Sequence, residues 1–200
     1  MSNGKLITLE GIDGAGKSTH LDTVAALLRS RGKDVVLTRE PGGTPLGEKL
    51  RAVLLSQKMD LDTETLLMFA ARREHIVQVI APALAGGRWV VSDRFTDATY
   101  AYQGAGGGME KDRIAVLERW VNSGLAPDLT LVFDVPVDVA LGRLSKRDRF
   151  ESEGEAYFHR VRAAYLERAA AEPRRVRVVD GQKAMAEVKK EVEKYISSIC

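Results

Sequence analysis

The feature that most constrains the fold of this chain is a glycine-rich segment near its N-terminus that reads G-x-x-x-x-G-K-S. It follows an apolar run at 6–9 and consists of Gly11, Ile12, Asp13, Gly14, Ala15, Gly16, Lys17, Ser18 and Thr19. Glycines let the backbone turn back on itself, so that successive N–H groups and the positive end of the next helix converge on a phosphate. In such a loop the lysine reaches the β- and γ-phosphates and the serine hydroxyl ligates Mg²⁺. A chance match is the alternative, but the strand before the loop and the helix after it favour a nucleotide-phosphate site.

Composition and charge limit the class of protein. A chain of 200 residues with 44% hydrophobic content can form one compact domain, or one domain with a small inserted lid. Its formal net charge of +2 is too small for a nucleic-acid scaffold, so we expect no nucleic-acid partner. The only cysteine is Cys200, which excludes an internal disulfide framework and fits a reducing compartment. No segment approaches 18 uninterrupted apolar residues, so we expect a soluble cytoplasmic protein with no membrane partner.

Short apolar runs alternate with helical patterns along the chain. The expected strands are 6–9, 34–38, 88–92, 129–135 and 176–179, and the expected helices lie at about 21–28, 46–55, 62–84, 110–122, 137–144, 155–172 and 186–199. We expect a kink at Pro82 in the longest of these helices. Strands that alternate with helices after a phosphate loop imply a parallel sheet covered on both faces. We therefore predict an α/β fold in which residues 1–200 form one domain around a five-stranded parallel sheet with helices on both faces.

Two polar segments follow strands of the predicted sheet directly. Residues 39–45 are rich in turn formers, and Asp93 and Arg94 end the third strand. In open parallel sheets, ligands bind beyond the carboxyl ends of the strands. There Asp93 could hold Mg²⁺ or its waters, and Arg94 could bind a phosphate through two N–H groups. The alternatives are an ordinary surface loop and a surface ion pair.

The helix at 62–84 carries an arginine within an apolar stripe. Leu66, Phe69, Arg73, Ile76 and Ile80 share one helical face by their spacing. Taken singly, Phe69 would more often belong to the core, and Arg73 would extend along the apolar surface towards water. Together, the two could stack a planar base and hydrogen-bond its carbonyl groups. The residues themselves leave both interpretations open.

A basic segment lies between two expected helices at about 143–154. It contains Arg143, Lys146, Arg147 and Arg149 and is followed by acidic and glycine residues. A solvated run of charges is the ordinary explanation. A short basic segment between helices is also how a closing lid brings arginines over a transferring phosphoryl group.

Taken together and in order, these motifs resemble those of the bacterial thymidylate kinases, a family of P-loop nucleoside monophosphate kinases. The resemblance spans nearly the whole chain and rests on the segments 9–19, 38–43 (Thr-Arg-Glu-Pro-Gly-Gly), 93–95 (Asp-Arg-Phe), 101–104 (Ala-Tyr-Gln-Gly) and 127–130 (Pro-Asp-Leu-Thr). It implies a kinase that transfers the γ-phosphoryl group of ATP to dTMP, with Mg²⁺, to give dTDP and ADP in dTTP synthesis.

The resemblance also implies roles for individual residues. ATP would be bound by residues 11–19 and by Arg143, and Mg²⁺ by Ser18 and Asp93. The acceptor would be bound by Arg39, Glu40, Arg51, Phe69, Arg73, Arg94, Thr99, Tyr102 and Gln103. In this set the arginines at 39, 51 and 94 hold the monophosphate, Phe69 stacks the thymine, and Arg73 hydrogen-bonds its carbonyl. Thr99 and Gln103 complete the base pocket, and Tyr102 crowds the 2′ position. Asp13 would contact the sugar 3′-hydroxyl or the water shell of the metal.

The catalytic set that the resemblance implies is Lys17, Arg94, Asp13, Arg147 and Arg149. Some members of the family carry an arginine inside the phosphate loop and others supply it from the lid. Because position 15 is Ala15, the lid must supply it here, and we favour Arg147 and Arg149 over Arg143. The resemblance further suggests a homodimer formed through the helices that follow the second and third strands. Two other functions remain open: a kinase for another monophosphate, and a nucleotide-dependent switch or binding module.

Overall fold

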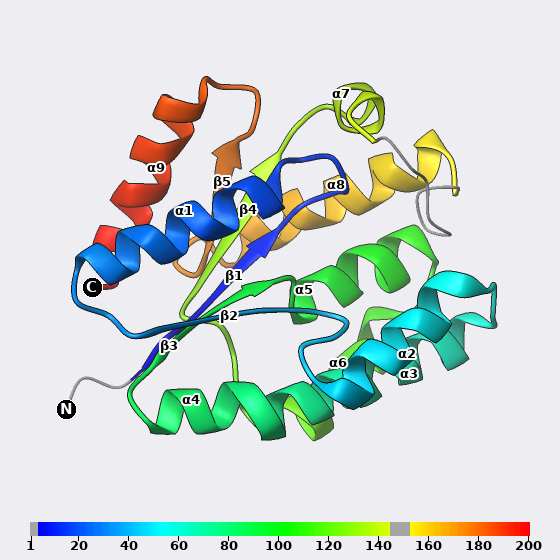
Figure 1. The fold of residues 1–200 in the computed structure, drawn as a ribbon. Coiled ribbons are helices and arrows are strands. Elements are labelled where there is room, and N and C mark those ends of the chain that lie inside the picture. The colour runs from blue at the N-terminus through cyan, green and yellow to red at the C-terminus, as the bar shows by residue number, and fades with distance from the viewer. Residues whose placement is uncertain (1–3, 145–152) are drawn as a thin grey trace.

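The computed structural model describes residues 4–144 and 153–200, which form a parallel sheet surrounded by helices (Figure 1). The strands are β1 (Leu6–Glu10), β2 (Val35–Arg39), β3 (Trp89–Asp93), β4 (Leu129–Asp134) and β5 (Val176–Asp180). Their order across the sheet is β2-β3-β1-β4-β5, and every neighbouring pair is parallel. This confirms the predicted α/β fold with a five-stranded parallel sheet.

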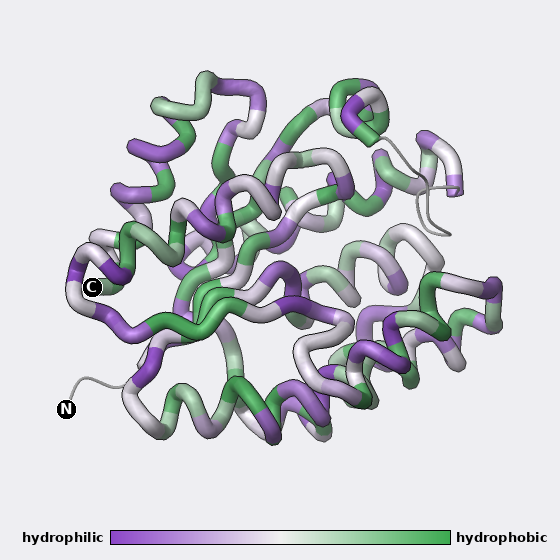
Figure 2. Tube along the Cα trace, viewed as in Figure 1, coloured by the Kyte–Doolittle hydropathy of each residue, from purple (hydrophilic) through white to green (hydrophobic). Residues whose placement is uncertain are grey.

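The central strands are apolar on both faces because both faces are covered. All five residues of β1 are buried, as are the first five of β4. The two polar residues that face each other across these strands, Thr8 and Thr130, satisfy one another with a hydroxyl–hydroxyl hydrogen bond of 2.8 Å. Figure 2 shows the apolar strands in the interior and polar residues on the outer turns of the helices. Strands buried on both sides need such continuous apolar runs, which is why they were recognisable in the sequence.

The helices are α1 (Lys17–Ser30), α2 (Pro45–Ser56), α3 (Leu61–His75), α4 (Ala81–Ala85), α5 (Thr96–Thr99), α6 (Lys111–Asn122), α7 (Val137–Gly142), α8 (Glu155–Ala171) and α9 (Met185–Ser197), with π-helical turns η1 (Ile76–Ile80) and η2 (Tyr100–Gly106). Helices α1 and α9 pack against each other and cover one face of the sheet, and α8 covers the other (Figure 1). None of the helices in the described ranges has the length and apolar character needed to cross a membrane.

The expected long helix at 62–84 is present as the continuous run α3-η1-α4. Its irregular turn lies at 76–80, just before Pro82, whose ring prevents the regular hydrogen bond at that point. The segment 100–106 forms the π-helical turn η2. This turn packs against α8, so the end of α5 is fixed against the core.

Candidate active site

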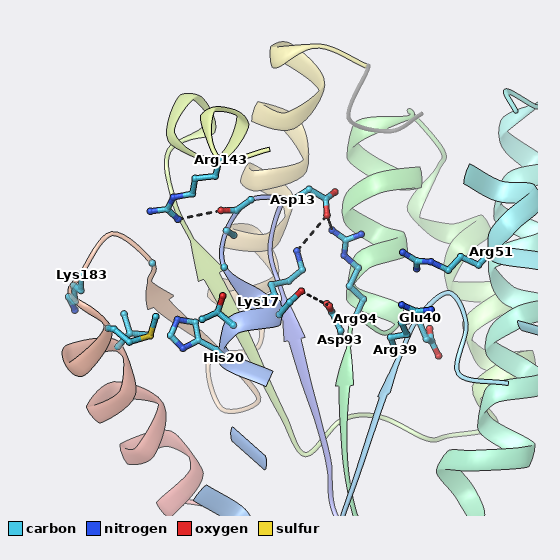
Figure 3. Close-up of a pocket in the computed structure, with 18 residues that line it drawn as sticks. Asp13, Lys17, His20, Arg39, Glu40, Arg51, Asp93, Arg94, Arg143 and Lys183 are labelled. Atoms are coloured by element: carbon cyan, nitrogen blue, oxygen red, sulfur yellow. Dashed lines mark hydrogen bonds and ion pairs between the residues drawn. The ribbon is translucent and has the colours of Figure 1, made fainter. Parts of the chain in front are cut away.

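A cavity of about 660 Å³ lies at the carboxyl end of the sheet (Figure 3). It opens between the glycine-rich loop, the ends of β2 and β3, and the turn that leads from β5 to α9. Its lining consists of residues 13–20, Arg39, Glu40, Arg51, Asp93, Arg94, Arg143, Gly181, Lys183, Met185 and Val188. The sequence had placed a ligand at this edge of the sheet, and the cavity lies there.

The glycine-rich loop presents backbone N–H groups to this cavity. Gly16 is the N-cap of α1 with a φ of 93°, no side chain caps the helix, and its first turn holds no acidic residue. Gly14 has a φ of 81°, and a Cβ there would lie 2.1 Å from the carbonyl oxygen of Ala140. Only glycine therefore fits where the loop passes α7. The uncapped helix end is a ready anion site.

Lys17 projects from the first turn of α1 and is held back against its own loop. Its Nζ donates to the carbonyl oxygens of Gly11 (3.0 Å) and Ile12 (2.9 Å) and lies 3.8 Å from Oδ1 of Asp13. The side chain is only 6% exposed. Burial, and then the charge of Arg94, lower the pKa of Lys17. An anion bound in the loop would satisfy this cation better than two neutral carbonyl groups do.

Asp13, Arg94 and Tyr102 form a closed triangle beside the loop. Arg94 donates from Nη2 to Oδ1 of Asp13 (2.6 Å) and to the hydroxyl of Tyr102 (2.7 Å), and that hydroxyl donates to Oδ2 of Asp13 (2.9 Å). Burial alone would raise the pKa of Asp13, but Arg94 and Lys17 outweigh it and lower the pKa to about 2. The site therefore contains a fixed carboxylate and a fixed guanidinium at neutral pH.

Arg94 adopts an unusual backbone conformation, with a φ of 71°. Its own N–H donates to the carbonyl oxygen of Leu9, and Ser92 Oγ donates to its carbonyl oxygen at 2.8 Å. The next N–H, of Phe95, donates to Oε1 of Glu10 at 2.7 Å. A left-handed conformation costs a non-glycine residue energy and persists only where its surroundings hold it. Sequence reasoning missed this role of Glu10, although an acidic residue at the end of an apolar strand was a signal for it.

Ser18 and Asp93 lie together at the floor of the cavity. Oγ of Ser18 is 3.5 Å from Oδ2 of Asp93, and Oδ1 of Asp93 is buried without a hydrogen-bond partner. A hydroxyl and a carboxylate are the hard oxygen ligands that Mg²⁺ prefers, and Mg²⁺ takes its other ligands from water and phosphate. The residues present therefore fit a magnesium ion.

A second, narrower cavity adjoins the first. It lies between α2, α3 and α5, and its lining consists of Asp13, Glu40, Pro41, Arg51, Leu55, Met68, Arg72, Arg94, Phe95, Ala98, Thr99, Tyr102 and Gln103. The Glu40–Pro41 peptide bond in its wall is cis. The predicted acceptor residues Thr99, Tyr102 and Gln103 are thus brought together here. Gln103 is oriented by its Nε2, which donates to Oε1 of Glu64 at 2.8 Å.

The prediction that Phe69 and Arg73 face this cavity is wrong. Phe69 is 2% exposed and belongs to the core, and Nη1 of Arg73 donates to the carbonyl oxygen of Val121 on α6 at 3.1 Å. Met68 and Arg72 take the positions expected for them. Successive residues of an α-helix point about 100° apart around its axis, so the residues that directly follow Met68 and Arg72 point away from the cavity. Apart from the exposed Leu66, the apolar stripe faces protein, and the stripe with Met68 and Arg72 faces the cavity.

Arg72 is a buried guanidinium that lines this cavity and has one nitrogen without a hydrogen-bond partner. Its Nε donates to Oε2 of Glu40 at 2.7 Å, and its Nη2 donates to the carbonyl oxygen of Phe95 and to Oγ1 of Thr99, both at 3.1 Å. Its Nη1 is buried and has no hydrogen-bond partner. An unpaired N–H donor inside a protein is costly, and a ligand carbonyl group in the cavity would satisfy it.

The remaining predicted arginines in the described residues line the wide cavity, and Arg51 also lines the narrow one. Arg39 pairs with Glu48 on α2 at 2.8 Å, and Nη1 of Arg51 donates to the carbonyl oxygen of Pro41 at 3.0 Å. Nη1 of Arg143 donates to the carbonyl oxygen of Gly14 at 3.3 Å. Burial and the neighbouring arginines lower the pKa of Arg51, which indicates an excess of positive charge at this edge. The other two lid arginines, Arg147 and Arg149, lie outside the described residues.

Comparisons with known proteins agree with this geometry. The family model described as Thymidylate kinase matches residues 9–192. The thymidylate kinase of Cupriavidus necator is 61% identical over 201 residues, which cover 98% of this chain and 99% of that protein. The thymidylate kinase of Methylobacillus flagellatus is 57% identical over 192 residues, which cover 94% and 95%. The crystal structure of thymidylate kinase from Ehrlichia chaffeensis superposes with a TM-score of 0.81 at 36% identity, over 98% of this chain and 99% of that one.

Proposed function

We propose that the two adjoining cavities divide the substrates of a thymidylate kinase, the family to which this chain belongs. The chain is a nucleoside monophosphate kinase that phosphorylates dTMP. The wide cavity takes ATP and the narrow one takes dTMP. The single observation that carries this division is the free Nη1 of Arg72, a donor that a base carbonyl can satisfy.

The glycine-rich loop binds the donor phosphates. The uncapped N-terminus of α1 supports this, because no side chain occupies the N–H groups of its first turn, which can hold the β-phosphate. Lys17 exchanges its two carbonyl partners for phosphate oxygens. Residues 11–19 and Arg143 together bind the triphosphate, and the part of the cavity walled by Lys183 and Met185 accommodates the nucleoside.

The narrow cavity binds the acceptor. Arg72 donates to a carbonyl oxygen of thymine, Met68 lies against the ring, and Thr99 and Gln103 complete the pocket. Tyr102 lies on the sugar side, where it disfavours a 2′-hydroxyl. The acceptor phosphate is held at the junction of the cavities by the guanidinium groups of the arginines at 39, 51 and 94, two of which line both cavities.

Transfer then proceeds in line between the two cavities. An oxygen of the dTMP phosphate forms a bond to the γ-phosphorus, and the bond from that phosphorus to the β–γ bridging oxygen breaks, which releases ADP. Negative charge spreads over the equatorial oxygens, where Lys17 and Arg94 stabilise it. Asp13 holds Arg94 in place and contacts the sugar 3′-hydroxyl or the water shell of the metal. Ser18 and Asp93 would hold Mg²⁺, which supplies charge neutralisation on the phosphate oxygens when bound.

The segment 143–154 acts as the lid of a single domain formed by residues 1–200. The side chain at position 15 is a methyl group in the wall of the wide cavity, so the loop itself brings no further cation to the γ-phosphate. We assign that role to Arg147 and Arg149, which follow Arg143 closely in the chain. An arginine placed in this way is worth on the order of a thousandfold in rate in related phosphoryl transfer.

The protein forms a homodimer through α3 and α6. The apolar groove between these helices includes Leu66 and Trp120, which are 54% and 76% exposed, with Val116 on α6 exposed beside it. Exposed apolar patches of this kind mark interaction sites. The small net charge supports small-molecule substrates in place of nucleic acid, and we propose that the protein works in the cytoplasm without a membrane partner.

The test is an acceptor panel. The protein is incubated with ATP and Mg²⁺ and with dTMP, dUMP, dCMP, dGMP or dAMP in turn, and the diphosphates are separated and quantified. We expect dTMP to give the highest kcat/KM. A faster reaction with another monophosphate would reassign the narrow cavity. Nucleotide binding without transfer to any acceptor would refute the proposal and indicate a switch or a binding module.

A further inference from the structure

A line of buried side chains continues behind Arg72, away from the cavity. His75 follows Arg72 on α3 by three residues, and its Nδ1 pairs with Oε1 of Glu40 at 3.0 Å. Its other ring nitrogen, Nε2, pairs with Oγ1 of Thr38 on β2 at 2.6 Å. Oε2 of Glu40 accepts from Nε of Arg72. Four side chains from β2, the following loop and α3 are therefore joined in one line that ends at the free Nη1 of Arg72.

Because these side chains are buried, each depends on its hydrogen bonds to the others. The side chains of Arg72, His75 and Glu40 are 3%, 0% and 4% exposed. A carboxylate taken out of water is stable only when its oxygens are paired, and here His75 satisfies one oxygen and Arg72 the other. Without the ring nitrogen, Oε1 of Glu40 would be left unpaired. The carboxylate would then turn to find another partner and would carry the guanidinium of Arg72 with it.

The ring of His75 has no freedom to move. Gly43, with a φ of 78°, lies directly against it, and a Cβ at that position would be 2.7 Å from both Cδ2 and Nε2 of the ring and from Oγ1 of Thr38. The backbone of the loop therefore passes one edge of the imidazole with no room for a side chain between them, and hydrogen bonds to Thr38 and Glu40 hold the two ring nitrogens.

We propose that His75 is a positioning residue for recognition of the acceptor base. With Thr38 it fixes Glu40, and Glu40 holds Arg72 so that its unpartnered Nη1 is available to a carbonyl group in the narrow cavity that Arg72 lines. This inference rests on the proposed function, in which Arg72 contacts the base. A guanidinium can only donate hydrogen bonds, so a fixed one favours rings with a carbonyl group at that point, such as thymine, over rings with an amino group there, such as cytosine. Loosening Arg72 therefore reduces discrimination against dCMP.

Three variants separate positioning from folding. His75→Phe keeps a planar ring and removes both nitrogens. His75→Asn retains an amide N–H close to the position of Nδ1 and should rescue the bond to Glu40. Thr38→Val removes only the outer hydroxyl. As a stability control, Ile80→Val removes one buried methyl group from η1 and no hydrogen-bonding group. Unfolding temperatures are measured for all four.

The readout is the ratio of kcat/KM for dTMP to that for dCMP, with KM for ATP measured in parallel. We expect His75→Phe to lower this ratio about tenfold, the loss of roughly one charge-assisted hydrogen bond. His75→Asn should restore most of it, Thr38→Val should lower it several-fold, and KM for ATP should stay within about twofold. If His75→Phe does not fold, the ratio measured for Thr38→Val tests the proposal instead, and a lower ratio again supports it.

A ratio that stays at the parent value in the folded His75 and Thr38 variants would overturn the proposal. Arg72→Lys shows which step has failed. If Arg72→Lys lowers the ratio and the His75 and Thr38 variants do not, Arg72 contacts the base without help from His75. If Arg72→Lys leaves the ratio unchanged as well, the assignment of the base to the narrow cavity fails.

Discussion

Replacement of Arg72 by lysine is the sharpest perturbation of the acceptor site. The guanidinium donates from Nε to Glu40 and from Nη2 to the carbonyl oxygen of Phe95 and to Thr99, which leaves Nη1 without a partner in a side chain that lines the narrow cavity. A lysine has one nitrogen on a flexible stem, so it can pair with Glu40 or reach the base, and not both. The charge is kept while the direction of the free donor is lost.

The expected loss follows from that single donor. A hydrogen bond from a charged group contributes about 1.5–3 kcal/mol, which corresponds to roughly 10- to 150-fold in kcat/KM for dTMP. The bonds from the same guanidinium to Phe95 and Thr99 are lost as well, so we also expect a fall in the free energy of unfolding. KM for ATP should change little, because Arg72 does not line the wide cavity.

The next residue along the helix provides a matched control. Arg73→Lys makes the same chemical change one position further on, where the side chain only donates to the carbonyl oxygen of Val121 on α6. Steady-state kinetics at saturating ATP should show a large effect for Arg72→Lys and an effect below about twofold for Arg73→Lys. The reverse ranking would refute the assignment of Arg72, and equal small effects would show that neither arginine contacts the base.

Three further predictions concern stability and assembly. Phe69→Ala should lower the free energy of unfolding by about 3–5 kcal/mol, because the ring is buried in the core. The ring lies under the guanidinium of Arg72, so we also expect KM for dTMP to rise, but by less than in Arg72→Lys; urea denaturation and kinetics check this, and a rise in KM as large as that of Arg72→Lys would contradict it. Burial, and then the charge of Asp97, raise the pKa of Glu10 from 4.5 to about 8. Between these two pH values the folded state binds a proton that the unfolded state does not. The free energy of unfolding should therefore fall as the pH rises from 4.5 to about 8. Glu10→Gln should flatten that slope by up to about 1.4 kcal/mol per pH unit, and an equally steep slope in the variant would count against a raised pKa. Trp120→Glu places a charge in the exposed α3–α6 groove and should shift sedimentation towards the monomer, whereas a parent-like profile would argue against this interface.

The sheet and the phosphate loop could be predicted because their signals are local. Strands buried on both faces need unbroken apolar runs, and the loop needs glycines at fixed spacing before a helix. Parallel topology then brings the carboxyl ends of β1 and β3 together, so Asp13 and Arg94 could be expected in one site. The triangle with Tyr102 follows from the same topology and from the packing of η2.

The face of α3 could not be predicted in the same way. Periodicity selects the more apolar stripe, and that stripe packs against protein, whereas the stripe with Met68, Arg72 and His75 contacts the ligand cavity and the polar line behind it. Arg72 and Arg73 are also adjacent, and nothing local in the sequence indicates which of them faces the acceptor. The role of Glu10 was hidden for another reason, since its partner Phe95 is 85 residues away and only the sheet brings them together.

The wall between the two cavities has a thermodynamic consequence. Both cavities are lined by Asp13, Glu40, Arg51 and Arg94. A phosphate that enters one cavity therefore changes the electrostatic field in the other and the ion pairs of the side chains that face it. Such a shared wall makes the affinities of the two substrates interdependent. By reciprocity, whatever factor the donor nucleotide imposes on the dissociation constant of dTMP, dTMP must impose on that of the nucleotide.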